Sequence, residues 1–284
     1  MRIEKLNLGS FEIYGLQDGL FHLDGGAMFG VVPKVLWQRK FPADERNRIK
    51  LALNCLLIKT KDALVLIETG IGSKLDPKSS DLYSVKTKPG LIPSLSEVGY
   101  GIEDLNFVIN THLHFDHCGG NTYKNNKGEI VPTFPKTKYI IQKGEWEYAL
   151  HPCLRDRTSY LNDNFLPLEK HGLAGLIEGN KKIVEGVEVI LVPGHTAFHQ
   201  CVKVQSQGKA LFFLGDLVPT SGHIGLPYIM SYDLYPLETL KNKEIYYQEA
   251  IKEDWILAFN HDPEHYFGKV EKDGDKYKFQ PFLA

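Results

Sequence analysis

Short apolar runs separated by polar turns dominate this chain, a pattern that is typical of β-strands. We expect three hairpins, each made of two such runs around a polar turn, at residues 51–67, 200–214 and 266–279. Residues 2–23 alternate in the same way, and we expect Gly9-Ser10 and Asp18-Gly19 to form turns between their strands. The chain should therefore be rich in antiparallel sheet.

Single apolar runs predict further strands at residues 106–110, 138–142, 187–192 and 255–259. A helix is predicted over residues 143–150, and a longer helix should begin near Pro236. The apolar stripe expected on that longer helix comprises Leu237, Leu240, Tyr247, Ala250 and Ile251.

Two segments interrupt the regular pattern. An arm around residues 24–40 combines glycines, which argue against regular structure, with Met28, Phe29, Val31 and Val32, which are too apolar for a solvent loop. We expect this arm either to pack onto a neighbour or to line a pocket. Residues 143–180 form a predicted insertion, partly helical, that could roof a pocket, and we treat 1–284 as a single domain.

Composition narrows the class of protein. The 284 residues are 43% hydrophobic and 24% charged with a formal net charge of -2, which gives no electrostatic reason to expect a nucleic acid or anionic membrane as partner. No apolar run is long enough to span a bilayer, and the first residues lack the apolar core of a signal peptide. The cysteines are widely spaced without a C-x-x-C pair, which indicates reduced thiols and a cytoplasmic location.

The densest chemistry follows the predicted strand at 106–110. His112, His114, Asp116 and His117 fall within six positions, ahead of a glycine pair. In an extended chain His112 and His114 point the same way, whereas Asp116 and His117 must diverge, so one loop can serve two metals. Imidazole suits zinc and related ions, and a chance match to so dense a pattern is rare.

Three more polar residues share this context. His195, Asp216 and His261 each follow a predicted strand and precede a turn, so all could meet at one edge of a sheet. Their long sequence separations require a site assembled by tertiary structure. His151 and His171 lie outside any ligand spacing and are expected on the surface.

Together, the H-x-H-x-D-H run at 112–117, Pro-Gly-His-Thr at 193–196, Gly-Asp at 215–216 and His261 resemble the metallo-β-lactamase superfamily. The resemblance implies an α+β fold, an αβ/βα sandwich of two mixed sheets with helices on the outer faces. It also implies two divalent transition metal ions, with zinc as the leading candidate. Carried over by position, one ion would take His112, His114 and His195, the other Asp116, His117 and His261, with Asp216 bridging. Glu68 departs from the aspartate common at its position.

Two such ions can share a water and lower its pKa towards neutrality, which suits attack on a carbonyl or phosphoryl centre. Asp116 would then shuttle a proton to the leaving oxygen. The arm and residues 215–228 resemble quorum-quenching lactonases of the YtnP type and methyl-parathion-hydrolase-like enzymes. The resemblance implies a lactonase for N-acyl homoserine lactones or, alternatively, an aryl esterase or phosphotriesterase. Met28, Phe29, Val31 and Val32 would contact the apolar part of the substrate.

Two further expectations depend on this likeness. Another lactonase branch has a tyrosine where this chain has Pro219, so the role of orienting the carbonyl must fall elsewhere. His223 is the candidate, with a purely structural histidine as the alternative. The arm suggests a homodimer, because the enzymes it resembles are often dimeric and its apolar groups would otherwise be exposed.

Rival functions fit less well. A glyoxalase-II-like thioesterase would need a helical domain, and few residues follow His261. A nuclease of this superfamily would need a basic face, and a flavin-linked member would need an attached flavodoxin-like domain. A non-enzymatic metal-binding scaffold would usually have lost ligands, whereas all of them are present here.

Overall fold

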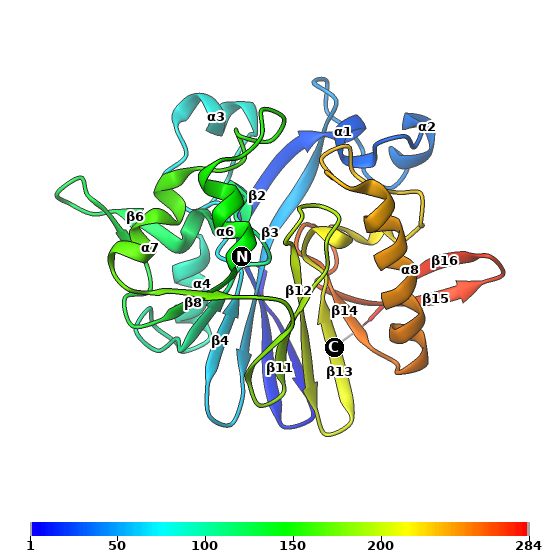
Figure 1. Cartoon of the computed structure of the whole chain (residues 1–284). Coiled ribbons are helices and arrows are strands. Elements are labelled where there is room, and N and C mark those ends of the chain that lie inside the picture. Colours follow the sequence, from blue (N-terminus) through cyan, green and yellow to red (C-terminus); the bar gives the residue numbers. More distant parts are fainter. Residues whose placement is uncertain (1, 283–284) are drawn as a thin grey trace.

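Two seven-stranded sheets pack face to face in the computed structural model, which describes residues 2–282 (Figure 1). The first sheet contains, in spatial order, β1 (Glu4–Leu8), β2 (Phe11–Asp24), β3 (Arg48–Lys59), β4 (Leu64–Ile67), β5 (Phe107–Ile109), β8 (Lys138–Gln142) and β9 (Ala174–Ile177). The pairs from β1 to β4 are antiparallel, and those from β4 to β9 are parallel, so the sheet is mixed.

The second sheet contains, in spatial order, β10 (Lys181–Val184), β11 (Val187–Leu191), β12 (Gln200–Ser206), β13 (Lys209–Phe213), β14 (Ile256–Ala258), β15 (Phe267–Asp273) and β16 (Lys276–Pro281). Only β13 and β14 pair in parallel. A separate ribbon pairs β6 (Thr122–Lys124) with β7 (Ile130–Pro132). The three predicted hairpins are confirmed as β3–β4, β12–β13 and β15–β16.

Side-chain alternation along the strands produces the layers. In β3, Leu56 and Ile58 join the core between the two sheets, while Leu57 points to the opposite face. That outer face is covered by α4 (Leu91–Glu97), α6 (Lys143–Leu150) and α7 (Leu166–Lys170), and the outer face of the second sheet by α8 (Pro236–Lys252). The expected αβ/βα sandwich is therefore confirmed (Figure 1). Because one core joins both sheets, we propose that the chain is a single domain.

The N-terminal strands differ from the sequence prediction at one point. Gly9-Ser10 is a turn, as expected, but Asp18-Gly19 is not, because β2 runs on to Asp24. The register against β3 shifts between Gln17 and Gly19, which marks a β-bulge. The bulge lets the Asp18 carboxylate accept backbone N–H groups from another loop instead of ending the strand.

The arm is more regular than expected. It contains α1 (Gly25–Phe29) and α2 (Lys34–Trp37), because the Asp24 carboxylate accepts the Ala27 N–H at 2.7 Å and caps the first turn despite the glycines. The remaining short helices are α3 (Pro77–Leu82) and α5 (Phe115–Cys118), with 3₁₀ turns at η1 (Gly119–Asn121), η2 (Asn162–Asn164), η3 (Gly215–Leu217) and η4 (Ser221–His223).

The last part of residues 143–180 supplies β9 at the edge of the first sheet. One other prediction needs correction. In α8, Leu237 is 80% exposed and Ile251 39% exposed, so the predicted apolar stripe is wrong at both ends. The buried face of α8 instead includes Lys243, whose Nζ donates to backbone carbonyls of the 223–228 loop. Among the described residues, no helix is long and apolar enough to cross a membrane.

Candidate metal centre

Strand ends bring the sequence-predicted polar residues to one edge of the sandwich. β5 ends just before the 112–117 run, and His195 follows β11. Asp216 lies in η3 directly after β13, and His261 lies just after β14. Because β11, β13 and β14 all point the same way, their C-terminal ends meet at that edge. The fold alone therefore assembles the cluster.

The structure brings all seven predicted residues together. They form three overlapping buried groups in which the potential ligand atoms lie within 4.8 Å of one another: His112, His114 and His195; His112, His117 and Asp216; and Asp116, His117 and His261. The first and third groups contain the histidines and Asp116 in the division expected for two ions.

Unsatisfied atoms in this cluster fit divalent cations. His112 Nε2 and Asp216 Oδ1 are buried and have no hydrogen-bond partner among the described residues, which is unusual for buried polar atoms. His195 Nε2 lies 3.1 Å from His114 Nδ1, and His261 Nε2 lies 3.2 Å from His117 Nε2. Histidine nitrogens and carboxylate oxygens that converge in this way are the ligands that zinc and related ions prefer.

Asp216 lies between the two groups. Its Oδ2 is 3.2 Å from His195 Nε2, and its Oδ1 is 3.5 Å from His117 Nε2 and 3.3 Å from His261 Nε2. Burial opposes ionisation, but these histidines hold the pKa of Asp216 well below its usual value. The carboxylate is therefore ionised and placed where a bridging ligand is needed.

Two histidines of the first group, His112 and His114, are neutral imidazoles. Burial and the neighbouring histidines lower the pKa of His112 and His114 well below the usual value. A histidine must be neutral to bind a metal through a ring nitrogen. Both side chains are thus in the protonation state that coordination requires.

Several supporting residues were missed by the sequence analysis. The Asp233 carboxylate accepts from His195 Nδ1 at 2.9 Å, and Glu145 accepts from the Leu113 N–H between two cluster histidines. His199 Nε2 accepts the Asp216 N–H at 3.1 Å. The adjoining Gly215 has a φ of 51°, and a Cβ there would lie 2.6 Å from His199 Nε2, so only glycine fits. Of these residues, only His199 could have been identified as part of the site from the sequence, because it follows the predicted ligand His195 by four positions.

Glu68 supports the metal loop from behind. Its Oε1 accepts the Thr111 N–H at 2.7 Å and lies 3.7 Å from His117 Nδ1, too far for a hydrogen bond. The residue has a φ of 63°, which is uncommon for a side chain of this kind. The longer side chain at this position therefore holds the loop backbone rather than the histidine ring.

A cavity of about 320 Å³ opens onto the cluster. Its walls are formed by residues from the arm, the 73–90 segment, the 151–160 segment and the 228–233 loop, together with cluster residues. They include Leu23, Met28, Tyr83, Phe115, Arg155, Asp156, Thr158, Ser159, Met230, Ser231 and Tyr232. Residues 155–159 contribute to it as the expected roof, whereas His151 and His171 are exposed elsewhere, as expected.

The four predicted substrate-binding residues separate into different environments. Met28 lines this cavity, but Phe29, Val31 and Val32 do not. Phe29 is 1% exposed and packs inside the arm, Val32 is buried, and Val31 is 89% exposed. The arm thus folds onto its own chain, and only Met28 faces the pocket.

His223 lies outside the cavity. It is fully buried, with Nε2 donating to the Met28 carbonyl at 2.8 Å and Nδ1 2.7 Å from the Thr220 hydroxyl. Its ring stacks on Phe29 with centroids 4.3 Å apart. Both ring nitrogens are therefore occupied by protein groups, which favours the structural alternative and leaves no donor to orient a carbonyl.

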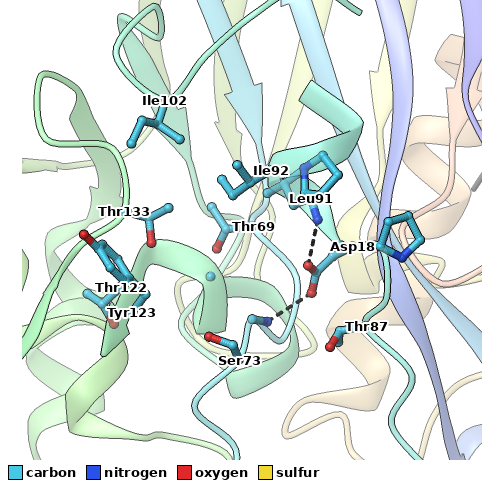
Figure 2. A pocket seen from close by; sticks show the side chains of 15 residues that line it. Asp18, Thr69, Ser73, Thr87, Leu91, Ile92, Ile102, Thr122, Tyr123 and Thr133 are labelled. Carbon is cyan, nitrogen blue, oxygen red and sulfur yellow. Dashed lines mark hydrogen bonds between the residues drawn. The ribbon is translucent and has the colours of Figure 1, made fainter. Parts of the chain in front are cut away.

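A second cavity, of about 450 Å³, lies next to the metal loop but is lined by none of the seven cluster residues (Figure 2). Asp18 lies at its wall and accepts the N–H groups of Ile71, Gly72 and Leu91. These bonds join the β2 bulge to the loop after β4 and to the start of α4. Asp18 is thus a buried structural carboxylate away from the cluster.

Comparison with known proteins adds independent information. The family model described as the metallo-beta-lactamase superfamily matches residues 49–249. An N-acyl homoserine lactonase of Bacillus cereus is 29% identical over 178 residues, covering 59% of this chain and 64% of that protein. A probable metallo-hydrolase of Mycobacterium tuberculosis is 26% identical over 252 residues, or 78% of each chain. The match therefore spans less than two thirds of the lactonase's length.

Solved structures resemble the whole fold. A probable metal-dependent hydrolase from Staphylococcus aureus superposes with a TM-score of 0.89 at 30% identity, over 98% of this chain and 100% of that one. AidC, described as a dizinc quorum-quenching lactonase, superposes with a TM-score of 0.82 at 21% identity, over 99% and 98%. At that identity, the likeness to AidC shows the fold alone.

Proposed function

This chain belongs to the metallo-beta-lactamase superfamily, and we propose that it is a binuclear metal-dependent hydrolase that opens lactones, with N-acyl homoserine lactones as the leading substrates. The single observation that carries the proposal is the buried cluster of unsatisfied histidine and aspartate atoms at the floor of a cavity whose walls are partly apolar. The names of the Bacillus relatives and of AidC support the choice of lactones.

Two zinc ions are the proposed cofactors. His112, His114 and His195 would hold one ion, Asp116, His117 and His261 the other, and Asp216 would contact both. When bound, the two ions would supply Lewis acidity and lower the pKa of a shared water.

Residues of this chain would do the rest of the chemistry. Asp116 is buried but lines the cavity, so it can pass a proton to the leaving oxygen of a bound ester or lactone. Tyr232 also lines the cavity, and its hydroxyl has no hydrogen-bond partner among the described residues. Burial raises the pKa of Tyr232, so the hydroxyl stays protonated. We assign it the role of donating a hydrogen bond to a substrate oxygen, in place of His223.

Apolar walls would hold the acyl chain. Leu23, Met28, Phe115 and Met230 surround the cavity, and burying a methylene there contributes roughly 0.8 kcal/mol. Aryl esters or phosphotriesters are the second candidate substrates. The rings of Tyr83, Phe115 and Tyr232 in the same cavity favour this alternative, because they could stack on an aryl group.

A homodimer remains part of the proposal. Val31, Val35 and Leu36 in the arm are 89%, 61% and 46% exposed, although Trp37 beside them is buried in its own chain. Covering these side chains with a second copy would remove apolar surface from water. Sedimentation of the purified protein tests this point, and a monomer at all concentrations would contradict it. We also propose a cytoplasmic location, because the cysteines are widely spaced in the sequence without a C-x-x-C pair.

The function is tested by assaying the zinc-loaded protein against N-acyl homoserine lactones of graded chain length, aryl esters, phosphotriesters and phosphodiesters. We expect the highest kcat/KM for a lactone, and loss of all turnover in Asp216→Ala. Turnover of phosphodiesters with neither lactone nor ester hydrolysis would reject the substrate assignment.

A further inference from the structure

His195 is held by a carboxylate that does not line the cavity. Its Nδ1 donates to Asp233 Oδ1 at 2.9 Å, which leaves Nε2 free to face the cluster. The second oxygen of Asp233 accepts from the Thr239 hydroxyl at 2.8 Å, and Asp233 is 3% exposed. Such a carboxylate determines both the tautomer and the orientation of a ligand histidine and makes the facing nitrogen more basic.

Glu145 connects three segments around the same group. Its Oε1 accepts the Leu113 N–H at 3.1 Å, between His112 and His114, and the Tyr160 hydroxyl at 3.0 Å. Its Oε2 accepts the Thr196 hydroxyl at 2.7 Å, next to His195. The Tyr160 ring packs edge-on against His114 with centroids 4.8 Å apart. One fully buried side chain therefore fixes the backbone beside all three histidines of the first group.

The Asp116–His117–His261 group has weaker support. His261 Nδ1 donates only to the neutral Ala52 carbonyl at 2.8 Å. His117 Nδ1 has no partner, because the nearby Glu68 oxygen is 3.7 Å away and already accepts a backbone N–H. Asp116 accepts no hydrogen bond from the described residues and faces the cavity. Apart from Asp216, which lies between the two groups, no buried carboxylate among the described residues is hydrogen-bonded to a ring nitrogen of this group.

From this asymmetry we propose that Glu145 and Asp233 are positioning residues that make the His112–His114–His195 group hold its cation more tightly than the Asp116–His117–His261 group. The two ions then bind and leave in order, and the ion of the Asp116–His117–His261 group leaves first. The inference rests on the proposed metal centre but not on the substrate.

Graded chelation of the zinc-loaded full-length chain tests the proposal. Bound zinc per chain is measured after equilibration at a series of buffered free-zinc concentrations, without any activity assay. The wild type should release its zinc in two resolved steps. Asp233→Ala and Glu145→Ala should each lower the zinc affinity of the tighter step by about 10–100-fold and leave the affinity of the weaker step unchanged. Glu145→Gln should recover most of the affinity, since its remaining oxygen can still accept from Leu113 and Tyr160.

Asp18→Ala is the matched control. Asp18 is also a buried carboxylate with three donors, but none of its partners Ile71, Gly72 and Leu91 adjoins a cluster residue in the sequence (Figure 2). This variant should lose thermal stability and keep both zinc steps unchanged.

Four outcomes would overturn the inference: a single zinc affinity in the wild type, equal weakening of both steps in the Asp233 and Glu145 variants, the same selective change in Asp18→Ala, or no zinc binding at all. The last result would also remove the proposed metal-dependent function. Two-step release with the expected variant effects, in a protein that opens no lactone, would sustain the inference and reject only the substrate.

Discussion

Phe29→Ala distinguishes a structural arm from a substrate-binding arm. Phe29 is 1% exposed, its ring stacks on His223 at 4.3 Å and on Trp37 at 5.4 Å, and it does not line the cavity. Truncation should therefore leave a hole within the arm cluster and leave the substrate tail untouched.

The magnitude follows from general values. A buried Phe→Ala change costs about 3–5 kcal/mol, including the residual cavity. Unfolding entropy near the midpoint is about 2.1 cal/mol/K per residue, which for 284 residues gives about 0.6 kcal/mol/K. We therefore expect Tm to fall by about 5–8 °C, with the protein still folded at 25 °C.

Calorimetry of the zinc-loaded variant gives Tm, and kcat/KM for a long-chain and a short-chain lactone gives the substrate effect. The ratio of the two kcat/KM values should stay within about twofold of the wild type, since no wall of the cavity changes. Met28→Ala is the companion variant, because Met28 does line the cavity and should lower that ratio. An unchanged Tm in Phe29→Ala together with selective loss of the long-chain substrate would refute this reasoning.

Three other predictions follow from individual side chains. Asp216→Ala should lose more zinc than Asp116→Ala by elemental analysis, because Asp216 lies between both groups; equal losses would argue against a bridging position. Tyr232→Phe should lower kcat by about 100-fold with zinc content unchanged, whereas Tyr83→Phe should have little effect; equal kcat values for Tyr232→Phe and wild type would exclude the assigned donor. Burial lowers the pKa of Lys243 to about 7, while the unfolded chain keeps its proton up to about 10.5, so the unfolded state binds more protons between these values. The free energy of unfolding measured in urea should therefore rise between about pH 7 and pH 10, and this contribution should be missing in Lys243→Met. The same pH dependence in both proteins would contradict this assignment.

The cluster residues were predictable because short sequence motifs identify them. His112, His114, Asp116 and His117 share one loop, and the other three each follow an apolar run that could only be a buried strand. Strand ends at a common edge then bring such residues together. The hairpins were predictable for a similar reason, since alternation and turn residues both act over a few positions.

Features that depend on a distant partner were not predictable. Asp233 and Glu145 are ordinary acidic residues in the sequence, and only the fold places them against His195 and Leu113. Asp18 resembled a turn residue because its backbone partners lie more than fifty positions away. His223 resembled a catalytic residue until Met28 and Thr220 were found to occupy its ring nitrogens. Tertiary contacts decided each of these cases.

The central claim is that two metal ions held by this cluster carry the hydrolysis. Metal-free protein is titrated with zinc, and bound zinc and the rate of lactone opening are measured on the same samples. We predict that the rate rises from near zero and reaches its maximum at about two zinc ions per chain. Full activity in the metal-free protein, or a maximum at one ion with no further binding, would contradict the account.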